Sequence, residues 1–216
     1  MRILVTTGPT REHIDTVRFI TNASSGKMGC AVAEAAATAG HSVTLLAGAG
    51  VTGLPDGVEA VSFTGVDDLR AALDSRFDGC DALIMAAAVG DFRPEKRLKS
   101  KLSRNGGPIT LRLIPTEDIL AGMGERKRKG QTLVAFAVED RADERAAAKA
   151  RREMIRKNAD FVVVNTPEAM SADVSLACIL SRDGVALSWA ERPKRRLAAE
   201  IVRLLQGSDD SPGATA

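Results

Sequence analysis

Residues 82–88 read Ala-Leu-Ile-Met-Ala-Ala-Ala and contain no polar side chain. A strand with one solvated face alternates apolar and polar residues, whereas a continuous apolar run is typical of a central parallel strand that helices cover on both faces. Other apolar segments lie at 2–6, 41–46 and 132–138, and segments with helical character separate them. This alternation predicts an α/β fold, a three-layer Rossmann-like parallel sheet with helices on both faces.

The remaining elements continue this pattern and end in a hairpin extension. We expect helices at 27–39, 67–77, 117–123, 143–157 and 194–205, strands at 58–63, 109–114 and 161–165, a long charged loop at 90–107, and a hairpin formed by 174–180 and 184–188. Gly40 follows the first helix at a natural C-cap position. No linker or repeat is evident, so residues 1–206 are predicted to form a single nucleotide-binding domain, and the small, polar tail 207–216 is expected to be disordered.

Composition excludes several classes of partner. The 216 residues carry a formal net charge of +2, which is too balanced to indicate a nucleic-acid partner, and only 3% are aromatic, which disfavours base stacking. No apolar run is long enough to cross a bilayer and no leader precedes the first strand, so we expect no membrane partner and a cytoplasmic location. Cys30, Cys80 and Cys178 lie in apolar contexts without metal-ligand spacing, which is typical of buried, inert thiols.

The segment Asn22-Ala-Ser-Ser-Gly-Lys-Met-Gly29 ends a long polar loop and opens the first, alanine-rich helix. The first N–H groups of a helix lack intrahelical partners, and glycines at its entrance let an anion approach the backbone. The segment therefore predicts a phosphate site. A plain N-cap would also use Ser24 or Ser25, so this simpler interpretation stays open.

Known nucleotide motifs fit this segment poorly. The first strand-to-helix turn lacks Gly-x-Gly-x-x-Gly, which disfavours an NAD(P)-dependent oxidoreductase without excluding it. Thr21 and Met28 occupy positions where a P-loop needs Gly and Ser or Thr. The basic stretch 95–101 is either a solvated loop or a mobile cationic flap that neutralises phosphate charge.

Five segments together resemble the phosphopantothenate-cysteine ligase (phosphopantothenoylcysteine synthetase) family of coenzyme A biosynthesis. They are Gly8-Pro-Thr-Arg-Glu12, Val17-Arg-Phe-Ile-Thr-Asn-Ala-Ser-Ser-Gly-Lys-Met-Gly29, Ala86-Ala-Ala-Val-Gly-Asp-Phe-Arg-Pro94, Asp118-Ile-Leu120 and Phe136-Ala-Val-Glu139. The resemblance covers nearly the whole chain and implies a ligase that joins 4'-phosphopantothenate to cysteine through an acyl-nucleotide intermediate. The family uses CTP in most bacteria and ATP in the eukaryotic type. Because no decarboxylase segment precedes Met1, we expect a standalone ligase, with a separate decarboxylase as a further candidate partner.

The resemblance also implies roles for individual residues. Asn22, Lys101 and Arg18 match catalytic positions: Asn22 would hold the acyl-nucleotide, Lys101 the pentavalent phosphorus and the leaving pyrophosphate, and Arg18 the substrate loop. Nucleotide-binding positions are matched by Gly8, Ser24, Ser25, Gly26, Gly29, Asp91, Lys101, Asp118, Ile119, Phe136, Lys157 and Asn165, and substrate-binding positions by Asn22, Ala87, Ala88 and Asp91.

The resemblance further implies Mg²⁺, held largely by triphosphate oxygens and water; no metal ligand is assigned. It implies a homodimer that associates partly through the C-terminal hairpin, in which each active site borrows from its neighbour.

Two departures from the family pattern concern the nucleotide. Thr116-Glu117 stands where bacterial members usually have Asn-Pro, and Glu153 stands where a lysine usually precedes Lys157 by four residues, so that contact is absent or is moved to Arg152. A non-catalytic nucleotide-binding regulator is therefore a third interpretation.

Overall fold

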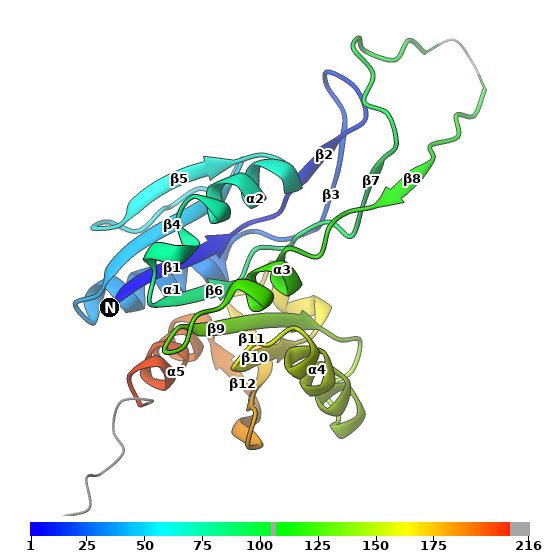
Figure 1. Ribbon diagram of the computed structural model, residues 1–216. Helices are drawn as coiled ribbons and strands as arrows, with labels where there is room; N and C mark the ends of the chain where they lie inside the picture. Colours follow the sequence, from blue (N-terminus) through cyan, green and yellow to red (C-terminus); the bar gives the residue numbers. More distant parts are fainter. Residues whose placement is uncertain (105–106, 208–216) are drawn as a thin grey trace, which may run out of the picture.

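The computed structural model describes residues 1–104 and 107–207, and its centre is one eight-stranded sheet (Figure 1). The strand order is β12-β11-β10-β9-β6-β1-β4-β5, and all neighbouring pairs are parallel except β10–β11 and β11–β12. The strands are β1 (Arg2–Thr7), β4 (Ser42–Gly48), β5 (Glu59–Phe63), β6 (Ala82–Met85), β9 (Thr132–Val138), β10 (Phe161–Asn165), β11 (Val174–Ser181) and β12 (Val185–Pro193). The predicted α/β class with a mainly parallel sheet is confirmed.

Helices cover both faces of this sheet, and each face has its own apolar core. The helices are α1 (Lys27–Thr38), α2 (Val66–Asp74), α3 (Ile119–Arg126), α4 (Glu144–Arg156) and α5 (Lys194–Gln206), with short 3-10 turns at Phe77–Gly79 and Pro167–Met170. α1 and α5 pack on one face around Val5, Ile84 and Val163, and α2, α3 and α4 pack on the other around Leu4 and Leu83. Alternate residues of β1 and β6 thus point into different cores, and this double burial explains why residues 3–5 of β1 and the whole of β6 are apolar in sequence.

Most element boundaries agree with the sequence within a few residues. The predicted strands 132–138 and 161–165 are observed with those bounds. Gly40, directly after the α1 C-cap, has φ +81°, a conformation that glycine adopts without strain. The strand predicted over 82–88 ends already at Met85, and the helix predicted over 67–77 is interrupted after Asp74, where a 3-10 turn follows.

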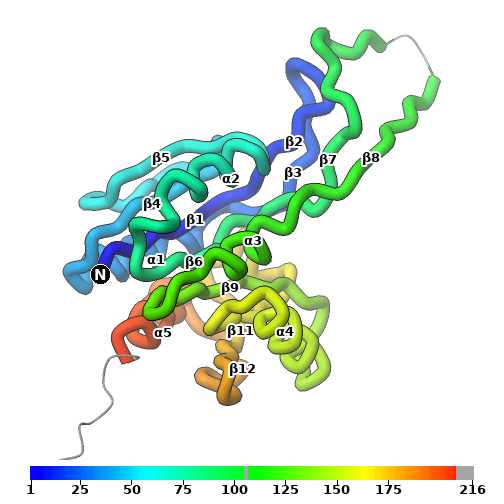
Figure 2. Tube along the Cα trace, viewed as in Figure 1, coloured from blue at the N-terminus to red at the C-terminus, as the bar shows by residue number. Residues whose placement is uncertain are grey.

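Four short strands form an arm that the sequence did not predict (Figures 1 and 2). The first polar loop contains a hairpin of β2 (Arg11–His13) and β3 (Phe19–Thr21), and the predicted charged loop 90–107 begins with β7 (Phe92–Pro94). The strand expected at 109–114 is only β8 (Leu113–Pro115), and it pairs with β7 instead of joining the central sheet. Three-residue strands without a buried face leave no periodic signal, which explains the error.

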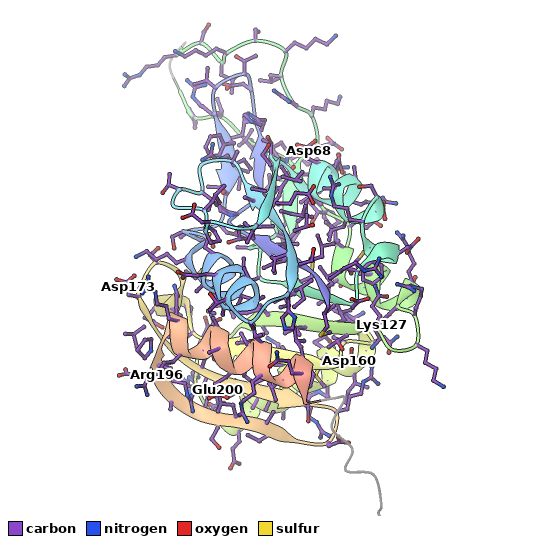
Figure 3. All side chains as sticks on the ribbon, turned by 90° about the vertical axis from the view of Figure 1, so that its left-hand side faces the viewer. Asp68, Lys127, Asp160, Asp173, Arg196 and Glu200 are labelled. Carbon is purple, nitrogen blue, oxygen red and sulfur yellow. The ribbon has the colours of Figure 1, made fainter. Side chains whose placement is uncertain are left out.

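The C-terminal hairpin lies at one edge of the central sheet. β11 continues the sheet from β10 in antiparallel register, and β12 is the edge strand. At the amino-terminal ends of β9 and β10, the Asp160 carboxylate accepts from the Leu133 N–H at 2.8 Å and from Lys127 at 2.6 Å. Lys127 and Asp160 are labelled in Figure 3.

Within the described residues, no helix is both long and apolar enough to cross a membrane. Of the tail 207–216 that was expected to be disordered, Gly207 is the C-cap residue of α5, and residues 208–216 lie outside the described part.

Candidate functional site

A cleft of about 530 Å³ opens at the carboxyl ends of β1, β6, β9 and β10. In sheet order β1 and β6 are neighbours, and the chain continues from β1 through β4 to β5 on one side and from β6 through β9 to β10 on the other. Ligands of open α/β sheets bind at such a reversal of strand order. The predicted residues that line the cleft are Asn22, Ser24, Gly26, Gly29, Ala87, Ala88, Asp91, Asp118, Ile119, Phe136, Lys157 and Asn165.

The N-terminus of α1 forms one wall and has no side-chain cap. Gly26 is the N-cap residue with φ +80°, a left-handed conformation that favours glycine. Neither serine caps the helix: Ser24 Oγ accepts only a long 3.4 Å bond from the Gly26 N–H, and Ser25 Oγ donates to the Met170 carbonyl at 3.0 Å. The geometry therefore favours the anion-site interpretation over the N-cap interpretation, because the first N–H groups of α1 stay available.

Two of the predicted glycines have packing reasons. A Cβ at Gly29 would collide with Thr7, and a Cβ at Gly8 would collide with Val51. Thr7 Oγ1 donates to the Gly26 carbonyl at 2.6 Å, so the start of α1 is fixed against the end of β1. Gly8 and Ser25 are not among the residues that line the cleft.

Asn22 lies opposite the segment that follows β6. Its Nδ2 donates to the carbonyl oxygens of Ala88 at 3.2 Å and Val89 at 3.1 Å, and its side chain lines the cleft. The amide donors are therefore occupied by the protein, while the Oδ1 atom can accept from a ligand. Thr116 also holds this segment, because its Oγ1 donates to the Gly90 carbonyl at 2.6 Å.

A charged group lies where α3 and α4 meet the cleft. Asp118 caps α3 by accepting from the Ala121 N–H at 3.1 Å, and it pairs with Lys157 Nζ at 2.9 Å. Burial raises the pKa of Asp118, but the hydrogen bonds from Lys157 and Ala121 outweigh it, so the net pKa lies below its usual value. Glu153 pairs with Arg156 at 2.6 Å, and Arg156 also approaches Asp118 at 3.7 Å. Arg156 therefore accompanies Lys157 beside Asp118.

Two buried polar side chains complete the cleft near α5. Asn165, 8% exposed, has no hydrogen-bond partner for its buried Oδ1 atom among the described residues, so this atom is available to a ligand donor. Lys194, 5% exposed, donates to the Ala169 carbonyl at 2.7 Å, and burial lowers its pKa. The structure shows no carboxylate within ion-pair distance of Lys194 in the described part of the chain. No sequence pattern indicated Lys194, because its burial depends on how α5 packs.

Arg18 and Lys101 lie on the arm and do not line the cleft. Arg18 pairs with Asp15 at 2.8 Å and donates to the Leu102 carbonyl at 3.2 and 3.3 Å. Lys101 is exposed, and no hydrogen bond or ion pair of its side chain is found among the described residues. Of the three predicted catalytic positions, the structure therefore brings only Asn22 into the cleft of its own chain.

Potential metal ligands and thiols are the remaining groups that could support catalysis. No group of three or more His, Cys, Asp or Glu residues with metal-binding geometry occurs in residues 1–104 and 107–207. Burial raises the pKa of Cys30 and Cys80, and raises that of Cys178 to about 11, which disfavours a thiolate nucleophile.

Comparisons with known proteins agree with this geometry. Residues 1–207 match the family model for the DNA/pantothenate metabolism flavoprotein C-terminal domain. The chain is 40% identical over 187 residues, 84% of its length, to the coenzyme A biosynthesis bifunctional protein CoaBC of Bacillus subtilis, and it covers 45% of that protein. It thus spans about half the length of the curated relatives that it matches.

Solved structures show the same relationship. The C-terminal domain of a CoaBC protein has a TM-score of 0.78 and 34% identity, covering 97% of this chain and 96% of that one. The Cab2 H337A variant in complex with phosphopantothenate-cysteine has a TM-score of 0.75 at 20% identity, over 95% of this chain and 86% of that one, and so shares the fold. The chain therefore belongs to the family of DNA/pantothenate metabolism flavoprotein C-terminal domains.

Proposed function

We propose that the protein joins 4'-phosphopantothenate to cysteine through an acyl-cytidylate, converting CTP to CMP and pyrophosphate. The observation that carries the proposal is the cleft in which the uncapped N-terminus of α1, Asn22 and the segment after β6 converge. Membership of the family and the 34% identical CoaBC domain support it. The choice of CTP over ATP rests on the resemblance to bacterial members.

The reaction needs two displacements, and the cleft offers groups for each. A carboxylate oxygen of phosphopantothenate attacks the α-phosphorus of CTP and expels pyrophosphate; the cysteine amine then attacks the acyl carbon and releases CMP. The N–H groups of α1 and the buried Lys194 ammonium offer positive charge to the phosphates. Asn22 Oδ1 would accept from an amide N–H of the substrate, and the small Ala87 and Ala88 leave the backbone accessible.

The resemblance implies Mg²⁺, and the side chains of the cleft fit a weakly held ion. The carboxylates that line the cleft are Asp91, Glu117 and Asp118; Asp118 pairs with Lys157, and Glu117 pairs with Arg70. Asp91 is the carboxylate best placed to contact a hydrated Mg²⁺ that triphosphate oxygens hold. The ion would neutralise phosphate charge during the first displacement.

We further propose a homodimer in which Lys101 reaches the cleft of the partner. Large apolar side chains are exposed along the arm, at Val17, Phe19, Phe92, Leu98, Ile109, Leu111 and Leu113. Exposed apolar side chains concentrated on one part of a protein favour association. The arm thus has more exposed apolar side chains than the C-terminal hairpin, where Val174 and Val185 are the exposed large apolar residues.

The first experiment measures pyrophosphate release with 4'-phosphopantothenate, cysteine and Mg²⁺, with CTP or ATP and with each substrate omitted in turn. The proposal predicts release that requires phosphopantothenate and is faster with CTP. Asn22→Asp should still release pyrophosphate but form little phosphopantothenoylcysteine. CTP binding without any release would contradict the proposal and favour the regulator interpretation, and oxidation or reduction of a nicotinamide would favour the oxidoreductase.

Subunit mixing tests the shared site. Asn22→Asp and Lys101→Ala are each expected to lose product formation, and the mixture should recover part of it, since one site of a mixed dimer has both wild-type residues. No recovery after verified exchange would contradict the transfer of Lys101 between subunits.

A further inference from the structure

Asp15 is a buried carboxylate on the arm, outside the cleft and outside every predicted role. It lies in the turn between β2 and β3 and is fully buried, whereas its ion-pair partner Arg18 is 45% exposed at the side chain. A carboxylate loses its hydration on burial, so it needs several hydrogen bonds in compensation. The donors of these hydrogen bonds identify the parts of the chain that Asp15 holds together.

Two of the four hydrogen bonds that the Asp15 carboxylate accepts come from backbone N–H groups of its own turn. Oδ1 accepts from the backbone N–H groups of Val17 and Arg18, both at 2.7 Å. The bond from the Arg18 N–H is the foremost cause that holds the pKa of Asp15 well below its usual range, so the side chain is ionised at neutral pH. A neutral Asn could make these two Oδ1 contacts equally well.

The other oxygen reaches a distant part of the chain. Asp15 Oδ2 accepts from the Leu102 N–H at 3.1 Å and from Arg18 Nη1 at 2.8 Å. The same guanidinium donates to the Leu102 carbonyl at 3.2 and 3.3 Å. Both backbone groups of Leu102 are therefore held by the Asp15–Arg18 pair, 87 and 84 residues away in sequence.

A second contact fixes the same segment four residues earlier. The Leu98 N–H donates to the Ile14 carbonyl at 2.9 Å, so the turn 14–18 holds segment 98–102 at both ends. Figure 2 shows these two parts of the chain side by side on the arm. Lys101 lies within this span, directly before Leu102, and no hydrogen bond or ion pair fixes its side chain within the described residues. These contacts thus place the backbone from which the Lys101 side chain extends.

We propose that Asp15 is a positioning residue that, together with Arg18, clamps Leu102 and thereby sets where Lys101 can act. The inference rests on the proposed function for the role of Lys101, but the clamp itself does not depend on it. The substrate class concerned is the nucleoside triphosphate, because a lysine on this segment neutralises phosphate charge.

Asp15→Asn is the sharpest variant, because it keeps Oδ1 for the turn and replaces Oδ2 with an amino group that cannot accept from Leu102 or Arg18. The first readout is native trypsin cleavage in the segment 96–104, which contains Lys96, Arg97, Lys99, Lys101 and Arg104. We expect cleavage there to become at least about tenfold faster, corresponding to roughly 1.4 kcal/mol for a lost charge-assisted contact. Glu95→Gln, which removes the exposed pair with Arg112 on the same arm, is the matched control and should leave the rate unchanged.

The second readout is a double-mutant cycle with Lys101→Ala. In an otherwise wild-type protein, Asp15→Asn should lower kcat for pyrophosphate release with little change in KM for phosphopantothenate. In the Lys101→Ala background, Asp15→Asn should lower kcat no further. Multiplicative effects of the two substitutions, or an unchanged tryptic rate, would overturn the proposal. If the wild type released no pyrophosphate, the proposed function would fail, and the tryptic comparison would still decide on the clamp.

Discussion

Gly124, in α3, is the position where a single methyl group should disturb both stability and the cleft. A Cβ there would collide with the Lys157 carbonyl oxygen, with the Lys157 carbonyl carbon at 2.9 Å and Asn158 Cβ at 3.3 Å behind it. These atoms belong to the end of α4, where Asn158 has φ +51° and donates from Nδ2 to the Gly124 carbonyl at 2.8 Å. Backbone cannot move aside as a flexible side chain does, so the two helices must separate.

The magnitude follows from three opposing terms. Alanine favours the helix over glycine by about 1 kcal/mol. Overpacking costs about 1–3 kcal/mol, and loss of the Asn158 hydrogen bond costs about 1 kcal/mol. We expect Gly124→Ala to destabilise the protein by roughly 1–3 kcal/mol. Lys157 should move with its backbone, so KM for the nucleotide should rise.

Gly122 is a matched control in the same helix. A Cβ at Gly122 would meet no atom within 4 Å, so Gly122→Ala should stabilise the protein by about 0.5–1 kcal/mol through helix propensity alone. Urea unfolding of the two variants and the wild type measures both effects. Equal stability of the two alanine variants would refute the reasoning, because the helix and the substitution are the same and only the contact with α4 differs.

Three further predictions concern Lys194, the three thiols and Asp118. Lys194→Met should weaken binding of inorganic pyrophosphate at least about tenfold, since hydrogen bonds from charged groups contribute about 1.5–3 kcal/mol; calorimetric titration measures this, and unchanged affinity would exclude Lys194 from the anion site. Iodoacetamide at pH 7 should leave pyrophosphate release intact, because burial raises the pKa of all three thiols; rapid inactivation would contradict this. Ionised Asp118 should add stability that is fully present above its unfolded pKa of about 3.9 and is lost as the pH falls through its lower folded pKa. The difference in free energy of unfolding between wild type and Asp118→Asn, measured by urea unfolding, should therefore become smaller below about pH 4. A difference that grows below this pH would contradict the prediction.

The sequence predicted the central sheet well because its strands are buried on both faces. Residues 132–138 and 161–165 are apolar without alternation, and only a strand between two helical layers satisfies such a run. The place of the cleft follows from the same sheet, since the loops after parallel strands meet at one edge. The motif around Asn22 then supplied the chemistry.

The arm and the buried polar groups could not be predicted in this way. β2 reads Arg-Glu-His, a polar triplet that pairs with β3 in a separate two-stranded sheet. The contact between Asp15 and Leu102 joins residues 87 positions apart, and neither residue is unusual in its local sequence. Lys194 was correctly predicted to begin a helix, but only the packing of α5 beside Ala169 makes its ammonium a buried cation of the cleft. Features that arise from tertiary contacts alone leave no periodic trace.

Gly29 shows how one residue serves both the fold and the site. The sequence suggested that this glycine lets a phosphate approach, whereas the structure shows that a Cβ would collide with Thr7 at the end of β1. The same Thr7 holds the Gly26 carbonyl, so the close approach of α1 to β1 is what directs the free N–H groups of α1 into the cleft. A larger residue at 29 would therefore impair an anion site without touching the anion, because the helix end would have to move away from the strand. The requirement for glycine is the same in both interpretations, so the motif alone does not distinguish the close approach of an anion from the close packing of α1 on β1.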